Sequence, residues 1–309
     1  MTTARAGAAS YTGTLALTAV APLVWGSTYF VTTEYLPPDR PMFTALMRAL
    51  PAGLLLLAAT RALPRGEWLW KAGVLGVLNI GAFFPLLFLA AYRLPGGVAA
   101  VLGSAQPMFA LGLAALLLNE KPTVRKVAAG LIGLFGVALV VLKSTAVLDT
   151  VGIVAGLLGA ASMGAGIVLT KKWGRPEGVG PLGMTGWQLT AGGIVLLPLA
   201  LLIEGAPPAL DATAIGGYLY LGLLGTAAAY GLWFRGLAKL PTSSASLLGL
   251  LSPLSAAVIG WIALGQSLGV IQWLGIVIAL GGTLLGQLAA APKPTTQLAE
   301  PVPVPVPAR

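Results

Sequence analysis

The sequence contains one segment twice, and this restricts the chain to an architecture with two related halves. Residues 76–107 (GVLNIGAFFPLLFLAAYRLPGGVAAVLGSAQP) align with residues 222–253 at a shift of 146 positions, with 11 identities in 32 positions. The identities include a Leu-Pro pair, a glycine and a later proline in one register, which similar composition alone does not produce. The sequence therefore predicts two copies of one unit.

Apolar stretches of about 20 residues, separated by short breaks, run through both copies; at 1.5 Å per residue such a helix crosses a hydrocarbon core of about 30 Å. Only 9% of the residues are charged, against about 25% in soluble domains. Backbone groups in lipid must be bonded within the segment, so the spans are helices. We expect an all-α membrane protein with ten transmembrane helices. Their predicted ranges are 13–33, 41–60, 68–92, 96–118, 124–143, 150–171, 181–203, 213–237, 242–264 and 269–289.

The distribution of Lys and Arg over the loops predicts the orientation. With a cytoplasmic N-terminus, 14 of the 18 basic residues fall on cytoplasmic segments and three on outer ones, while Arg48 lies within a helix. Cytoplasmic loops are enriched in Lys and Arg, so we expect a multi-pass protein of the cytoplasmic membrane with both termini inside. The predicted divisions are an N-terminal segment 1–12, five-helix repeats at 13–143 and 150–289, and a disordered Pro/Val-rich tail at 290–309.

Five helices per repeat is an odd number, so the second copy enters the membrane from the opposite side. In this alignment Trp25-Gly26 matches Met163-Gly164, Arg48 matches Gln188, and Pro107 matches Pro253. Inverted repeats are typical of secondary transporters, which bind substrate near the midplane and expose it to each side in turn.

The composition also limits the possible chemistry. The chain has no Cys and no His, which removes thiol chemistry, haem and most zinc sites. We expect no metal and no cofactor. The net charge of +9 is interpreted as a topology signal, so we expect a lipid bilayer and a small-molecule substrate as partners, and no nucleic acid. Gly130, Gly133 and Gly136, with a Gly282-x-x-x-Gly286 pattern, predict a close helix contact; an internal contact is favoured, and a homodimer is the alternative.

Arg48 is the charged candidate residue that lies within a predicted span. It lies about seven residues into its helix, where an Arg costs on the order of 3 kcal/mol on insertion scales. No Asp or Glu lies deep in a span. One interpretation is a counter-charge for a substrate carboxylate; the other is a structural Arg that snorkels outward or binds helix-end carbonyls.

Large or polar side chains in mid-helix positions are candidates for the walls of a substrate pocket, with bundle packing as the alternative for each. Besides Arg48, the predicted substrate-binding residues are Trp25, Tyr29, Asn79, Phe83, Gln106, Trp187, Gln188, Tyr230 and Ser252.

Pro107 and Pro253 recur at equivalent mid-helix positions, each following a glycine, Gly103 and Gly249. A mid-helix proline removes one hydrogen bond and frees a carbonyl upstream. We expect these four residues to act as hinges in gating, with a fixed kink as the alternative.

Several of these stretches resemble the drug/metabolite transporter superfamily, specifically its EamA-type members with two five-helix repeats. The resemblance covers roughly residues 15–290. The matching pieces are Trp25-Gly26-Ser27-Thr28, Arg48 with Pro51-Ala52-Gly53-Leu54, Gln106-Pro107, Asn119-Glu120-Lys121-Pro122-Thr123, Gly130 with Gly133 and Gly136, Trp187-Gln188 and Ser252-Pro253. The resemblance implies alternating access and, commonly, export of amino acids or related metabolites.

The resulting hypothesis is an exporter of amino acids or similar small amphipathic metabolites that works by facilitated diffusion or exchange. Two alternatives stay open. One is other cargo (drugs, sugars or nucleotide-linked metabolites). Drug cargo would call for a buried acid, and nucleotide-linked cargo would call for several basic residues in the spans. An intramembrane enzyme would need a nucleophile with a base, or a metal site.

Overall fold

The computed structural model describes residues 2–38, 40–93, 102–141, 149–265 and 269–290. These residues form helices joined by turns and short loops, and no strand occurs among them. The prediction of an all-α chain is confirmed.

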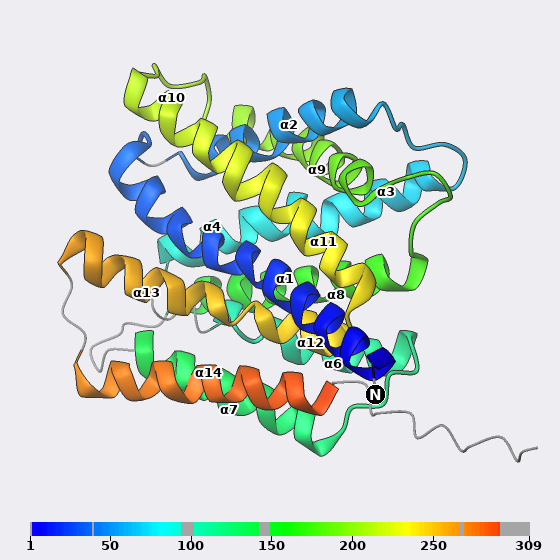
Figure 1. Cartoon of the computed structure of the whole chain (residues 1–309). Coiled ribbons are helices and arrows are strands. Elements are labelled where there is room, and N and C mark those ends of the chain that lie inside the picture. Colours follow the sequence, from blue (N-terminus) through cyan, green and yellow to red (C-terminus); the bar gives the residue numbers. More distant parts are fainter. Residues whose placement is uncertain (1, 39, 94–101, 142–148, 266–268, 291–309) are drawn as a thin grey trace, which may run out of the picture.

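The helices of the two halves follow one another with short connections (Figure 1). The first half holds α1 (Thr2–Tyr35), α2 (Pro41–Thr60), α3 (Trp68–Gly76), the π-helical segment η1 (Val77–Gly81), α4 (Phe83–Arg93), α6 (Gln106–Leu117) and α7 (Val124–Val141). The second holds α8 (Thr150–Trp173), α9 (Pro181–Ile203), α10 (Ala212–Leu219), η2 (Tyr220–Ala228), α11 (Ala229–Lys239), α12 (Thr242–Leu248), α13 (Leu251–Leu264) and α14 (Val270–Ala290). α1 starts earlier than expected because its Ala-rich first residues favour helix.

The outside of the bundle is apolar. Leu116 and Leu202 expose 79% and 83% of their surface, and such side chains together make a surface suited to lipid. Within the described residues, seven helical segments are long and apolar enough to cross a membrane, and two shorter apolar helices, Gln106–Leu117 and Val270–Gly286, accompany them. The chain is therefore a multi-pass membrane protein, and the number of ten spans stays a prediction.

Two expected helices, 68–92 and 213–237, contain π-helical segments that the sequence analysis did not predict. In η1 the Ala82 N–H donates to the Val77 carbonyl, five residues back, at 2.7 Å. Shifted by 146, η1 falls inside η2, so both repeats carry this widened turn at the same place. Such turns are frequent at functional sites.

The expectation that Pro107 and Pro253 lie in the middle of continuous helices is wrong. A turn at 104–105 precedes α6, and a turn at 249–250 separates α12 from α13. Proline has no N–H and its ring clashes with the carbonyl four residues earlier, which favours a turn just before Pro107 and Pro253, although Pro22, Pro51 and Pro198 lie within continuous helices. Pro107 and Pro253 lie in the first turn of the new helix, just after Gly103 and Gly249. Residues 94–101 of the expected helix 96–118 lie outside the described ranges.

α2 and α9 pack along their length in opposite directions. A Cβ added to Gly53 would lie 2.5 Å from the Thr190 backbone nitrogen, and one added to Gly193 would lie 2.8 Å from the Leu50 Cα. Residue numbers thus rise in α2 where they fall in α9. An axis that relates these two helices is perpendicular to them and lies in the membrane plane.

The contacts of the first helix in each repeat show the same exchange. A Cβ on Gly26 would lie 2.7 Å from the Ser252 carbonyl oxygen, and one on its counterpart Gly164 would lie 3.3 Å from the Gln106 carbonyl oxygen. Ser252 and Gln106 are themselves equivalent at the 146-residue shift. Each repeat therefore packs its first helix on the other repeat's fourth span, and the prediction of two inverted repeats is confirmed.

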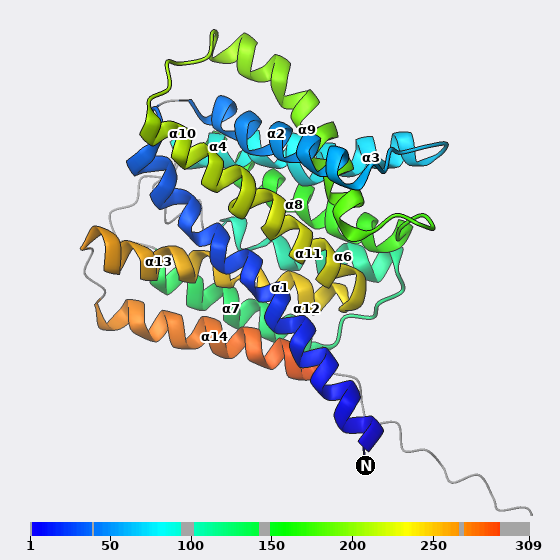
Figure 2. The same ribbon diagram turned by 45° about the horizontal axis from the view of Figure 1, so that its top comes forward.

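The glycine stripes form an internal contact between α7 and α14, which lie side by side in both views (Figures 1 and 2). A Cβ on Gly282 would lie 2.5 Å from the Gly133 nitrogen, and one on Gly136 would lie 2.4 Å from the Ala279 nitrogen. The neighbouring atoms are backbone, so only glycine allows this approach.

The two ends of the bundle differ in charge. One end, called the basic end here, gathers the N-terminus of α1, the end of α2, the end of α8, the start of α9 and the end of α11 with their Lys and Arg residues (Figure 2). At the opposite end the Glu204 carboxylate accepts hydrogen bonds from the Met42 and Phe43 N–H groups at 2.5 and 2.9 Å, and Arg93 pairs with Asp149 at 3.7 Å. In the described part of the chain, the segments with Arg61, Lys171, Arg175 and Lys239, which the Lys/Arg count assigns to one side, lie at the basic end.

Candidate functional site

Arg48 lies inside the bundle, with only 4% of its surface exposed. Its Nε donates to the Thr226 hydroxyl at 3.3 Å, and its guanidinium carbon lies 4.7 Å from the centre of the Phe84 ring. Arg48 belongs to α2 in the first repeat, whereas Thr226 belongs to η2 in the second. The charge is therefore held across the boundary between the repeats.

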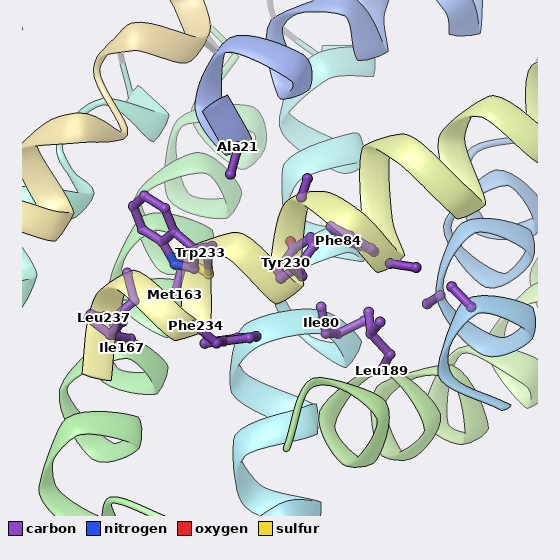
Figure 3. Packing of buried hydrophobic residues seen from close by; sticks show 14 of the residues in the cluster. Ala21, Ile80, Phe84, Met163, Ile167, Leu189, Tyr230, Trp233, Phe234 and Leu237 are labelled. Atoms are coloured by element: carbon purple, nitrogen blue, oxygen red, sulfur yellow. The ribbon is translucent and has the colours of Figure 1, made fainter. Parts of the chain in front are cut away.

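Aromatic rings of the central core lie beside Arg48, and Figure 3 shows Phe84, Tyr230, Trp233 and Phe234 among them. Tyr230, which is the repeat counterpart of Phe84, lies with its ring centre 4.8 Å from that of Trp25 and 5.8 Å from that of Phe234. Trp25 also approaches Trp233 at 5.3 Å and donates from its indole to the Gly225 carbonyl at 3.0 Å. Trp25, Arg48 and Tyr230, all predicted, thus belong to one cluster, which we call the Arg48 cluster together with Phe84 and Thr226.

Gln188 is fully buried on α9 at the position equivalent to Arg48. It accepts a hydrogen bond from the Asn79 side-chain nitrogen at 2.6 Å. The same nitrogen makes a long contact of 3.5 Å to the Thr170 hydroxyl. We call Asn79, Thr170 and Gln188 the Gln188 cluster; its members come from both repeats.

The two clusters occupy equivalent places under the repeat. In one, a side chain of α2 bonds to η2; in the other, a side chain of α9 bonds to η1. Backbone carbonyls of the π-helical segments take part as well: Trp25 of α1 donates to η2, and Ser162 of α8 donates to the Leu78 carbonyl of η1 at 2.8 Å. The widened turns thus present acceptors to the opposite repeat.

A cavity of about 280 Å³ opens beside the Gln188 cluster at the basic end. It lies between the end of α8, the first turns of α9 and the last turns of α11. Its walls include Thr170, Lys171, Arg175, Gln188 and Phe234. The cavity therefore connects a charged rim with a buried amide.

The remaining predicted residues lie in several places. Gln106 makes a long 3.5 Å contact to the Ser246 hydroxyl, and a Cβ on Gly249 would lie 3.6 Å from the Gln106 side-chain oxygen, so the two helix breaks meet there. Ser252 contacts Gly26 through its backbone. The hinge role of Gly103, Pro107, Gly249 and Pro253 stays a proposal.

Phe83 packs against the central core beside Phe84, with ring centres 5.6 Å apart. Trp187 lies at the basic end, where its indole donates to the Ala62 carbonyl at 2.7 Å and its ring lies 6.0 Å from Trp68. The structure thus places Trp187 in a separate packing cluster. The side chain of Tyr29 lies outside the described part of the structure.

Sequence reasoning missed Thr226, Phe84, Thr170 and Lys171. Phe84 matches the predicted Tyr230 under the 146-residue shift, so mapping that candidate onto its repeat partner would have found it. The same mapping takes Asn79 to Gly225, which indicates the segment of Thr226 but not Thr226 itself. Lys171 was interpreted only as an orientation signal, because its sequence position at a helix end gives no sign of a cavity.

Comparison with known proteins gives consistent results. The EamA-like transporter family matches residues 12–142 and again 150–286. Protein PecM of Dickeya dadantii is 47% identical over 267 residues, covering 86% of this chain and 90% of that protein. The uncharacterized transporter YwfM of Bacillus subtilis is 29% identical over 282 residues, covering 89% and 93%.

A solved crystal structure shares the fold, with a TM-score of 0.77 at 17% identity over 90% of this chain and 98% of the other. The duplicated match, the inverted contacts and the buried polar clusters at equivalent positions all agree. The chain belongs to the EamA-like transporter family of the drug/metabolite transporter superfamily.

Proposed function

We propose that the protein is a secondary transporter that exports amino acids or similar small amphipathic metabolites across the cytoplasmic membrane by alternating access, with both termini in the cytoplasm. The observation that carries the proposal is the pair of polar clusters. Arg48 and Gln188 occupy equivalent buried positions, and each bonds to a π-helical segment of the other repeat. A movement of one repeat against the other changes both clusters together.

The surroundings of Arg48 suit a small ligand with one carboxylate. Its guanidinium presents a planar set of donors that matches a carboxylate, and Phe84, Tyr230 and Trp25 supply apolar ring surface nearby. Nucleotide-linked cargo calls for several cations around the site, and among the candidate spans Arg48 is the basic residue furthest from a helix end. The cargo proposal therefore favours monocarboxylates with an apolar portion.

The test is counterflow in proteoliposomes, with the purified chain and a panel of radiolabelled amino acids. We expect accumulation of a subset of the panel with the wild type. Arg48→Gln is expected to abolish it while leaving the protein folded. Flat traces for the whole panel contradict the amino-acid cargo, and uptake of a nucleotide sugar or a cationic drug instead supports the alternative cargo.

The lack of acidic residues in the candidate spans bears on how transport is coupled to energy. The candidate spans contain no Asp or Glu, so a carboxylate proton relay has no residue to carry it. We propose facilitated diffusion or exchange. Concentrative transport that strictly requires an imposed pH gradient would contradict this.

A further inference from the structure

The cavity at the basic end has the chemistry of an anion receptor. Lys171 forms part of its wall, and its ammonium donates to the Leu237 and Leu240 carbonyls at 3.3 and 3.0 Å. An ammonium has three donors, so one remains for a ligand. Arg175 stands at the rim and donates to the Val179 carbonyl at 3.2 Å. The Glu120 carboxylate interacts electrostatically with Lys171. It also accepts a hydrogen bond from the Thr242 hydroxyl at 3.2 Å.

The inner wall of the cavity supplies a second donor. The Thr170 hydroxyl donates its hydrogen to the Gly166 carbonyl at 2.7 Å. The Thr170 oxygen can therefore only accept a further hydrogen bond, and the side-chain nitrogen of Asn79 faces it. Asn79 then donates to the Gln188 oxygen, which leaves the Gln188 Nε2 and the Asn79 Oδ1 buried without a partner. A buried donor without an acceptor is unfavourable. Gln188 lines the cavity but its Nε2 has no surface open to it, so an anionic oxygen would bond to this donor only when the side chain turns toward the cavity.

Two packed rings lead from the cavity wall toward Arg48, which interacts electrostatically with the Tyr230 hydroxyl. Phe234 lines the cavity, and the ring of Tyr230, one turn earlier on α11, lies 5.8 Å from it and belongs to the Arg48 cluster (Figure 3). A ligand that entered here would reach the rings before it reached Arg48.

The repeat shows that this receptor is not shared by the other end. In the alignment that pairs Gly26 with Gly164, Lys171 corresponds to Thr33 and Arg175 to Pro37. The equivalent positions at the opposite end therefore carry no cation. Anion capture is a property of the basic end.

We propose that this cavity is a first binding station for the carboxylate of the cargo, with Lys171 and the Gln188 amide as ligands and the Phe234–Tyr230 pair as the barrier before Arg48. The proposal rests on the transport function proposed above. At about 280 Å³ the station lies just below the usual range of about 300–1,000 Å³ for ligand pockets, so it takes a small metabolite.

The chain has no Cys, so a single introduced cysteine reports on the cavity without background. Ala238 lines the cavity and is exposed. We would introduce Ala238→Cys into the full chain in nanodiscs and compare its modification by an anionic and a cationic methanethiosulfonate reagent. Lys171→Gln is expected to lower the anionic-to-cationic rate ratio about fivefold. Lys172→Gln, an exposed neighbour outside the cavity, is the matched control and should leave it unchanged.

Ligand protection tests the carboxylate directly. Amino acids from the panel should slow modification of the introduced cysteine, whereas their carboxamides should not, and Lys171→Gln should remove the protection while Lys171→Arg keeps it. Equal protection by acids and amides, or protection that survives Lys171→Gln, overturns the proposal. Protection by inorganic phosphate with none by amino acids overturns the carboxylate assignment.

The station and the transport function can fail separately. Counterflow without protection of the introduced cysteine overturns the station and leaves the transporter. Protection without counterflow supports the station and contradicts the transport function.

Discussion

The Arg48 and Gln188 clusters occupy the same place in two copies of one fold, yet only one carries a charge. Arg48 bonds to a hydroxyl and stacks on Phe84, whereas Gln188 pairs with another amide, Asn79. Burial is nearly the same, at 4% and 0% exposed. The surroundings of the two side chains therefore differ in chemistry and not in depth.

This difference indicates that duplication supplied the geometry and that later divergence supplied the chemistry. A strictly symmetric protein would hold two like charges near its centre, and like charges repel at close range. Among the described residues Arg48 is the one buried cation, and the neutral Gln188 can contribute hydrogen bonds on the route to it. Substitutions that make the two clusters alike, or that weaken one of them, test this interpretation.

The largest expected effect comes from making the clusters alike. Gln188→Arg places a second cation in the bundle beside Lys171 and opposite the amide of Asn79, and it should lower the free energy of unfolding by about 3 kcal/mol. Thermal unfolding in detergent measures this. Gln188→Met, similar in length and uncharged, is the control and should cost clearly less. A Gln188→Arg protein as stable as the wild type would show that the neutral side chain is not required.

The next effect comes from removing a partner in each cluster. Asn79→Leu leaves the Gln188 oxygen buried and unpaired and should cost about 2 kcal/mol. Thr226→Val should cost about 1 kcal/mol, because Arg48 keeps its contact with the Phe84 ring. Chemical denaturation of both variants gives the comparison, and the reverse order would mean that the Arg48 cluster is the more tightly held.

The fold was largely predictable from the sequence because its determinants are local. Apolar length sets each span, the predicted odd number of helices per copy leads to the inversion, and the glycines of α7 and α14 set their contact. The helix breaks before Pro107 and Pro253 and the π-helical segments were not predicted. The π-helical segments depend on how the opposite repeat satisfies the freed backbone groups, as when Trp25 of the first repeat donates to the Gly225 carbonyl of the second.

The candidate site was predictable only in part. Charge or polarity inside an apolar run marked Arg48, Asn79 and Gln188, but which of them meet depends on packing between segments about 100 residues apart. The sequence positions of the aromatic side chains predicted their surroundings still less well, since Trp25 joins the Arg48 cluster whereas Trp187 packs at the basic end. Periodicity does not distinguish these two environments.

A smaller effect tests whether transport requires the planar guanidinium of Arg48 or only its positive charge. Arg48→Lys keeps the cation but loses the planar fork that binds a carboxylate in two places. Counterflow should fall about tenfold, which corresponds to about 1.4 kcal/mol of lost interaction, with little change in thermal stability. Lys172→Arg, at an exposed position, is the control and should leave transport unchanged. Full activity of Arg48→Lys would mean that charge alone is used.

The smallest effect concerns how the helices that carry the two clusters begin. α2, which carries Arg48, starts with its Met42 and Phe43 N–H groups bonded to the Glu204 carboxylate, whereas α9, which carries Gln188, starts after Gly180 without a side-chain cap. A carboxylate at a helix N-terminus contributes about 0.3–1 kcal/mol through the helix dipole. Glu204→Gln should therefore lower the free energy of unfolding by no more than about 1 kcal/mol, because the amide oxygen still accepts a hydrogen bond.

The same Glu204→Gln change weakens a hydrogen-bonded contact between the start of α2 and the end of α9. If the proposed transport cycle opens this end by separating α2 from α9, the opening breaks that contact. Counterflow should thus stay the same or rise slightly while thermal stability falls slightly. If Glu204→Gln lowered transport without affecting stability, the carboxylate would have a part in the transport cycle itself, and the asymmetry between the two halves would extend from their centres to their ends.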